Sequence, residues 1–181
     1  AGCGASESGG GSSGKKTERS AEEILSAQKT IAEYYKISYQ AKYVANKQTG
    51  KIEQLQLSSV PLTDLGVDRI SKLTDLTALN LVDTKISDAG LKHIGNLPNL
   101  LKLELGRNNI TDAGVEHLMG LKKLEKLYLN NTRVSDKGLM RLGELPGLNH
   151  LDVRRSRVTP RGRDKFEKTP VGRKRVFRLV N

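Results

Sequence analysis

Histidine and cysteine are the side chains of this sequence that could most readily hold a metal ion or act as a nucleophile. His93 and His117 lie 24 residues apart, and Arg141 takes the same place one interval later. Two imidazoles without a third ligand do not make the site that zinc requires. The single cysteine, Cys3, cannot form an internal disulfide. We therefore expect no metal, no cofactor and no disulfide-stapled scaffold.

Motifs that carry catalytic chemistry are missing from the sequence. It holds no phosphate-binding glycine loop, no GxSxG nucleophile turn and no HExxH zinc motif. Four aspartates could form acid–base pairs, but they recur every 24 residues and are expected instead to cap helix N-termini. They are Asp64, Asp88, Asp112 and Asp136. We predict no catalytic residues and a protein that is not an enzyme.

A 24-residue repeat sets the position of every element that could present a site. The repeated residues are Leu55, Leu79, Leu103, Leu127 and Leu151; Leu57, Leu81, Leu105, Leu129 and Val153; and Gly66, Gly90, Gly114, Gly138 and Gly162. Apolar residues two apart share one face of a short strand. No unit of this length can bury its apolar side chains alone, so the units must stack. The glycines are expected to leave room for close approach between units.

The pattern LxxLxLxxTxISDxGLxxI, seen from Leu76 to Ile94, resembles the leucine-rich repeat. It is most similar to the short ITDxGL-type, ribonuclease-inhibitor-like units of bacterial proteins. The resemblance implies an α/β solenoid of five repeats over residues 52–168, with a parallel inner sheet and short outer helices. It also implies a polar ladder between turns at Thr84, Asn108, Thr132 and Ser156. In the last unit Pro160 and Arg163 replace the usual residues, so we expect a degraded outer helix there.

Both ends of the repeat array are expected to be capped. Residues 17–51 predict an amphipathic helix from Ser20 to Tyr35, then a strand with alternating Ile37, Tyr39, Ala41 and Tyr43, and a turn at 46–50. A second extended segment follows at Ile52–Leu57. Residues 169–181 predict a final strand through Val176, Phe177, Leu179 and Val180, which would cover the open edge of the sheet.

The first sixteen residues are rich in glycine and serine and predict a flexible tether. Ala1-Gly2-Cys3, at its head, resembles the end of the signal-peptide box of bacterial lipoproteins. The resemblance implies a signal peptide, a diacylglycerol on Cys3, and a lipid-anchored protein of the cell envelope. The alternative is a cysteine in a linker of a cytoplasmic protein.

Basic residues are concentrated at the C-terminal end. The chain carries 31 basic and 20 acidic side chains, a net charge of +11, and its last 28 residues hold eleven basic and two acidic ones. Such an end could bind nucleic acid or an acidic surface polymer, or attract an anionic bilayer. The alternative is a solubilising surface.

The outward positions of the inner sheet are where such a solenoid would bind a partner. The first two rows are small or uncharged: Gln54, Gln56, Ser58, Ala78, Asn80 and Val82. The last three rows hold the anchors that we predict for a protein partner: Lys102, Glu104, Lys126, Tyr128, Asn130, His150, Asp152 and Arg154. We predict a non-catalytic protein-binding module, with polyanion binding through the basic end as the alternative.

Overall fold

The structure is a computed structural model that describes residues 26, 29, 31, 35, 36, 41–62, 64–169, 172–174, 176 and 177. Its strands are β1 (Lys42–Ala45), β2 (Ile52–Gln56), β3 (Ala78–Asn80), β4 (Lys102–Glu104), β5 (Lys126–Tyr128), β6 (His150–Asp152) and β7 (Val176–Phe177). Its helices are α2 (Asp64–Ile70), α3 (Asp88–Ile94), α4 (Asp112–Leu118), α5 (Asp136–Leu142) and α6 (Pro160–Glu167), with a 3₁₀ turn, η1, at Gly172–Lys174.

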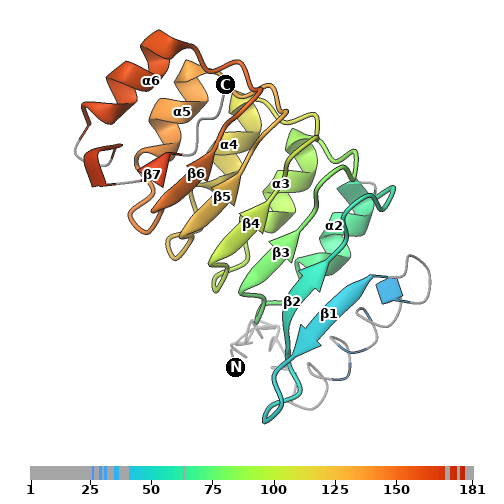
Figure 1. Cartoon of the computed structure of the whole chain (residues 1–181). Helices are drawn as coiled ribbons and strands as arrows, with labels where there is room; N and C mark the ends of the chain where they lie inside the picture. Colours follow the sequence, from blue (N-terminus) through green and yellow to red (C-terminus); the bar gives the residue numbers. More distant parts are fainter. Residues whose placement is uncertain are drawn as a thin grey trace, which may run out of the picture.

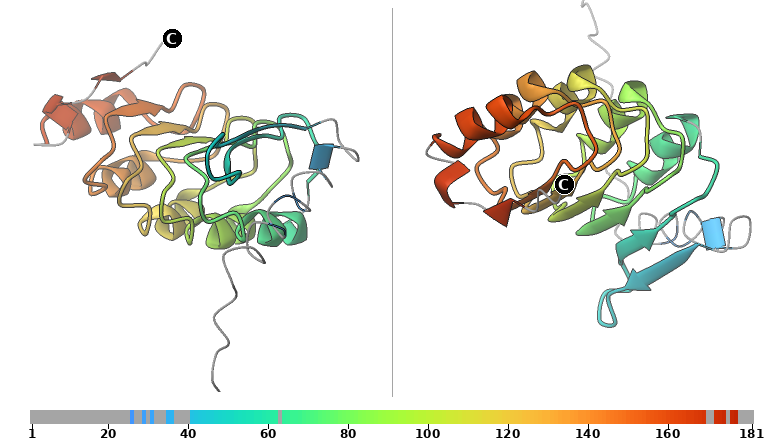
Figure 2. Two further views of the ribbon diagram at one scale, coloured as in Figure 1. Left: turned by 90° about the horizontal axis from the view of Figure 1, so that it is seen from below. Right: turned by 45° about the horizontal axis from the view of Figure 1, so that its top comes forward.

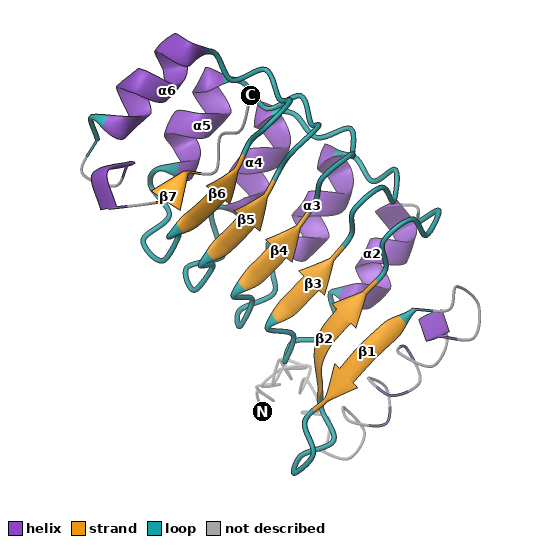
Figure 3. Cartoon of the chain, viewed as in Figure 1, coloured by secondary structure: helices purple, strands orange, loops and turns teal. Residues whose placement is uncertain are grey.

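The strands form one seven-stranded sheet in sequence order (Figure 1). From β2 to β7 neighbouring strands are parallel, and between β2 and β6 every paired residue is 24 positions from its partner. The sheet lines one side of a continuous coil and helices α2–α6 line the other (Figures 2 and 3). The predicted α/β solenoid is confirmed.

The core lies between the sheet and the helices and is built from the repeated apolar side chains. Leu55, Leu79, Leu103, Leu127 and Leu151 are each at most 1% exposed. Full burial of a leucine stabilises a fold by about 1.5–3 kcal/mol. Because the paired strands place these side chains next to one another, much of this burial depends on the stacking of neighbouring coils.

The expected polar ladder joins neighbouring turns at only one of its four positions in full. Asn108 accepts a hydrogen bond from the backbone N–H of Thr84 at 3.1 Å and donates to the Leu81 carbonyl at 2.7 Å, both in the preceding turn. The hydroxyls of Thr132 and Ser156 donate to carbonyls of their own turns, each at 2.6 Å. The Thr84 hydroxyl lies 3.3 Å from Asn108 Oδ1 and so joins the next turn through a side chain. A hydroxyl has no second polar group, so it cannot bond two backbone groups of the neighbouring turn as the Asn108 amide does.

The repeated aspartates are not the N-cap residues of their own helices, which corrects the prediction; Asp112 does accept a hydrogen bond at 3.1 Å from the Gly138 N–H, in the first turn of the next helix, α5. The N-caps of α3–α6 are Ser87, Thr111, Ser135 and Thr159. Each repeated aspartate accepts two hydrogen bonds from the N-cap residue of the next coil, one from its hydroxyl at 2.5–2.7 Å and one from its backbone N–H at 2.7–3.1 Å. The carboxylates are therefore clamps between coils, which sequence spacing along a single helix does not indicate.

Four of the five repeated glycines provide the space for these clamps, namely Gly90, Gly114, Gly138 and Gly162. A Cβ placed on Gly90 would lie 2.6 Å from Asp64 Oδ1, closer than any real contact of that kind. The expected close approach between units is confirmed, and the group that approaches is a carboxylate.

The last outer helix is regular, contrary to our expectation. Helix α6 spans eight residues, whereas α2–α5 span seven each. Pro160 occupies the first helical turn, where its missing N–H costs nothing and its fixed φ suits a helix. The Thr159 side chain accepts a hydrogen bond from the Gly162 N–H at 3.1 Å, and Phe166 is buried against the core.

The N-terminal cap is present in the residues that can be described. Residues 26, 29, 31, 35 and 36 are helical, and the Tyr35 hydroxyl donates to the Gly66 carbonyl at 2.5 Å. Strand β1 pairs antiparallel with β2, and the turn between them is closed by Asn46, whose Oδ1 accepts from the N–H groups of Gln48 and Thr49 at 2.9 Å. The predicted hairpin is confirmed, with β1 beginning at Lys42; residues 37–40 lie outside the described residues.

At the other end, β7 pairs with β6 and confirms the capping strand for Val176 and Phe177. Leu179 and Val180 lie outside the described residues, as do Cys3 and the predicted tether. Within the described part of the chain, no helix has the length and apolar character that crossing a bilayer would need.

Candidate functional site

The concave face is defined as the surface of β2–β6 and their following residues that points away from the helices. Side chains there alternate with the buried leucines, because neighbouring residues of a strand face opposite ways. In β2 and β3 it carries Gln54, Gln56, Ser58, Ala78, Asn80 and Val82. In the last three rows it carries Lys102, Glu104, Gly106, Lys126, Tyr128, Asn130, His150, Asp152 and Arg154.

A row of touching polar and aromatic side chains crosses four strands of this face. Asn80 Nδ2 lies 3.4 Å from Glu104 Oε2, and Glu104 Oε1 lies 2.7 Å from Lys102 Nζ. Lys102 Nζ also lies 5.5 Å from the centre of the Tyr128 ring, a cation–π distance. The Tyr128 and His150 rings are 5.0 Å apart and tilted by 44°. The half-buried Tyr128 ring is thus held between Lys102 and His150 by contacts within the folded chain.

The two acidic groups of the face are both paired with bases. The hydrogen bond that Lys102 donates to Glu104 raises the pKa of Lys102, with help from the negative charge of the carboxylate and despite the opposing effect of burial. The Asp152 carboxylate is 2% exposed. It accepts hydrogen bonds from Nε and Nη2 of Arg154 at 2.6–3.0 Å. This hydrogen bond raises the pKa of Arg154.

Asp152 must therefore be removed from the predicted contact residues, because its carboxylate is covered. Arg154 lies two residues after Asp152 and on the same face of the sheet. Its side chain is long enough to fold back over the Asp152 carboxylate. The other predicted anchors, namely Lys102, Glu104, Lys126, Tyr128, Asn130, His150 and Arg154, are exposed or half-buried on the concave face.

Lys126 is the exposed cation next to this row. In the part of the chain that the structure describes, no carboxylate forms an ion pair with it. The concave face near Tyr128 therefore presents one uncompensated positive charge beside an aromatic ring. Such a surface suits a carboxylate next to an apolar group.

The two histidines of the repeat lie on neighbouring outer helices, as expected. His93 Nδ1 lies 3.3 Å from Asp68 Oδ1. Among the described residues, no three His, Cys, Asp or Glu side chains lie close enough together to hold a metal ion.

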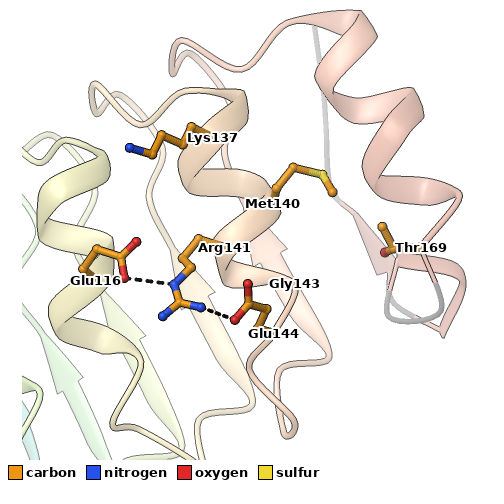
Figure 4. A pocket seen from close by; sticks show the side chains of 7 residues that line it. All are labelled: Glu116, Lys137, Met140, Arg141, Gly143, Glu144 and Thr169. Carbon is orange, nitrogen blue, oxygen red and sulfur yellow. Dashed lines mark hydrogen bonds and ion pairs between the residues drawn. The ribbon is translucent and has the colours of Figure 1, made fainter.

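A cleft on the outer surface was not predicted from the sequence. It has a volume of about 530 Å³ and is lined by Glu116, Lys137, Met140, Arg141, Gly143, Glu144 and Thr169. Figure 4 shows Met140 reaching toward Thr169, while Arg141 lies between Glu116 and Glu144 and is paired with both. The hydrogen bond that Arg141 donates to Glu116, together with the negative charges of Glu116 and Glu144, raises the pKa of Arg141. Met140 is the long apolar side chain of the lining and is 39% exposed, which the sequence pattern does not indicate.

The geometry can be compared with known proteins. The leucine-rich repeat family matches residues 74–134. Internalin C2 from Listeria monocytogenes has a similar structure, with a TM-score of 0.51 and 21% identity over 75% of this chain and 66% of that chain. The BIR2 ectodomain from Arabidopsis thaliana has a TM-score of 0.50 and 17% identity over 77% of this chain and 74% of that chain. These likenesses concern the fold.

A second protein of Listeria monocytogenes, an internalin designated F, is 25% identical with a TM-score of 0.49 over 77% of this chain. The chain spans 46% of that structure and slightly less than two thirds of internalin C2. No curated protein sequence matches the chain.

Proposed function

Because the chain is a leucine-rich repeat solenoid, a fold that generally serves non-catalytic protein binding, we propose that it captures a protein partner on its concave face. The single observation that carries this proposal is the row from Asn80 to His150, which fixes Tyr128 between Lys102 and His150. A tyrosine that is already ordered loses little conformational entropy on binding. Tyrosine is also among the residues that most often dominate binding energy.

The partner that suits this surface is an extended segment with a carboxylate beside an apolar side chain. The apolar group would pack on Tyr128, and the carboxylate would pair with Lys126. Glu104 and Asp152 offer no competing negative charge, because Lys102 and Arg154 neutralise them. Strands β3–β6 are only three residues long, so the face that they form is narrow along each strand. A narrow face suits an extended segment that crosses the strands.

The test selects binders from a displayed library of random peptides on the full chain. We expect the selected peptides to be enriched in Asp or Glu next to an apolar residue. The double variant Tyr128→Ala/Lys126→Ala should weaken their binding about 30-fold, the loss of one hot spot of ~2 kcal/mol.

The matched control is Gln54→Ala/Gln56→Ala, which shortens two side chains of the same face at its uncharged end. Its binding should equal that of the wild type. Equal binding by the Tyr128→Ala/Lys126→Ala protein, with unchanged thermal unfolding of both variants, would remove this end of the concave face from consideration.

We also propose that the protein works in the cell envelope, anchored by lipid on Cys3. The support is the Ala1-Gly2-Cys3 sequence and the glycine- and serine-rich stretch that follows it. The precursor with its own upstream region, expressed in a bacterium, should give a membrane-fraction protein whose intact mass begins at Cys3 with added acyl groups. A Cys3→Ser control should lack that mass. A wild-type protein with a free thiol in the soluble fraction would contradict the proposal.

A further inference from the structure

The loops that follow β3, β4, β5 and β6 line up along one edge of the solenoid. Each loop has two exposed positions that recur with the 24-residue step. The first, in which the backbone has a positive φ of 53–61°, is held by Asp83, Arg107, Asn131 and Arg155. The second, two residues later, is held by Lys85, Asn109, Arg133 and Arg157. Four of these exposed side chains, Arg107, Arg133, Arg155 and Arg157, are defined here as the arginine ridge.

Backbone hydrogen bonds between coils fix the ridge in place. The N–H of Arg107 donates to the Asn130 carbonyl at 2.9 Å, that of Arg133 to the Ile110 carbonyl at 2.8 Å, and that of Arg157 to the Val134 carbonyl at 2.9 Å. Strands of a sheet are about 4.8 Å apart, so the three loops that carry the ridge span only about 10 Å. The backbone of the loops that carry the four arginines is therefore already ordered in the folded protein.

The positive charge of the ridge is uncompensated at close range. Within the described residues, none of its four guanidinium groups lies within ion-pair distance of a carboxylate. The carboxylates of the same edge are turned into the gaps between coils: Asp112 is bound by Ser135, and Asp136 by Thr159. Asp83 stands at the far end, so the charge increases from β3 toward β6.

We propose that the arginine ridge binds a linear polymer whose backbone carries phosphates. A guanidinium group presents paired N–H donors that match two phosphate oxygens, which a lysine cannot do. The four groups form a row along the solenoid axis, and a row matches a chain of anions better than it matches a plane of lipid headgroups. The ridge lies on the loop edge and shares no residue with the proposed protein-binding residues of the concave face, so either function can fail without the other.

The substitutions that test the ridge are taken from the chain itself. Asn131 occupies the left-handed position in one loop, and Asn109 occupies the second position in another. Changing all four ridge arginines to Asn should not lower the free energy of unfolding in urea, because the four side chains are exposed and Asn accepts the left-handed backbone of Arg107 and Arg155 better than Arg does. The matched control removes four exposed lysines elsewhere, by Lys29→Gln, Lys47→Gln, Lys92→Gln and Lys122→Gln.

Binding is measured to inorganic polyphosphate and to a mixed-sequence single-stranded oligonucleotide of equal charge, over a range of salt concentrations. For the oligonucleotide, log affinity falls as log salt rises. Loss of four phosphate contacts should make this slope less steep by about 2.8, at ~0.7 for each contact. Polyphosphate binding should fall with it, and the control variant should retain both.

Three results would overturn the proposal. The first is an equal loss of binding in the lysine control, which would mean that only total charge matters. The second is binding to the oligonucleotide without binding to polyphosphate, which would mean that bases are recognised. The third is binding to phosphatidylglycerol vesicles and to neither polymer, which would assign the ridge to a membrane surface.

Discussion

A glycine-to-alanine change inside a helix ordinarily stabilises a protein, and Gly90 is expected to behave in the opposite way. In a helix interior alanine is favoured over glycine by about 1 kcal/mol. At Gly90 in α3, however, the added Cβ would lie 2.6 Å from Asp64 Oδ1 and would displace that carboxylate. Asp64 accepts hydrogen bonds from the Ser87 hydroxyl at 2.7 Å and the Ser87 N–H at 3.1 Å.

The magnitude follows from the two effects. Hydrogen bonds to a charged group contribute about 1.5–3 kcal/mol each, so losing both at the lower value costs about 3 kcal/mol. Subtracting the gain of ~1 kcal/mol in helix propensity leaves a net loss of about 2 kcal/mol for Gly90→Ala. Urea unfolding followed by circular dichroism would measure this change in the free energy of unfolding.

The sign of the effect should depend on the carboxylate. In an Asp64→Ala background the obstacle is gone, so Gly90→Ala should be neutral or stabilise by up to about 1 kcal/mol. Gly66→Ala is the natural control, because Gly66 holds the same repeat position in α2 and its Cβ would meet no carboxylate: it would lie 2.8 Å from the end of the Leu62 side chain and, at an ordinary contact distance, 3.5 Å from the Tyr35 hydroxyl. If Gly90→Ala raises the stability of the wild type as Gly66→Ala does, the clamp is not rigid and the reasoning is refuted.

Two further predictions concern the last helix and the concave face. Phe166→Ala should cost about 3–5 kcal/mol in urea unfolding, because its ring is 1% exposed and closes the core beside α5, and a loss near zero would show that α6 is dispensable. Lys102→Met should lose the stability supplied by the ion pair with Glu104. Because the folded pKa of Lys102 is raised, that contribution is present below about pH 10 and fades as the pH rises through the folded pKa. A difference between wild type and Lys102→Met that grows above pH ~10 would contradict this sign.

The fold follows from the sequence because one spacing controls it. A 24-residue step in leucine positions forces each coil to stack on the previous one in the same register, and the observed pairs between β2 and β6 follow that step without a shift. The N-terminal hairpin was also predictable, because its turn residues and alternation are local signals. Local and repeated signals agree, and the resulting arrangement buries the repeated leucines.

Side-chain interactions between coils were predicted less well. Each aspartate could in geometry serve its own helix or the next coil. The choice depends on the distance from the carboxylate to each of them, which the sequence does not give. Asp152 was counted as a contact residue because alternation places it on the open face, although Arg154 covers it. The regular helix α6 was not predicted because Pro160 and Arg163 depart from the repeat pattern; Pro160 nevertheless stands in the first turn, where proline is tolerated.

The antiparallel strand β1 makes the N-terminal edge of the sheet different from the parallel pairs inside the array. A stack of parallel strands is polar, and two such stacks could in principle join head to tail without limit, as heterologous contacts that do not close produce fibres. Strand β1 reverses the chain direction at that edge and places the exposed Lys42 and Val44 there. A further parallel coil therefore does not meet, at this edge, the strand direction with which coils pair inside the array. This mismatch disfavours head-to-tail growth into a filament.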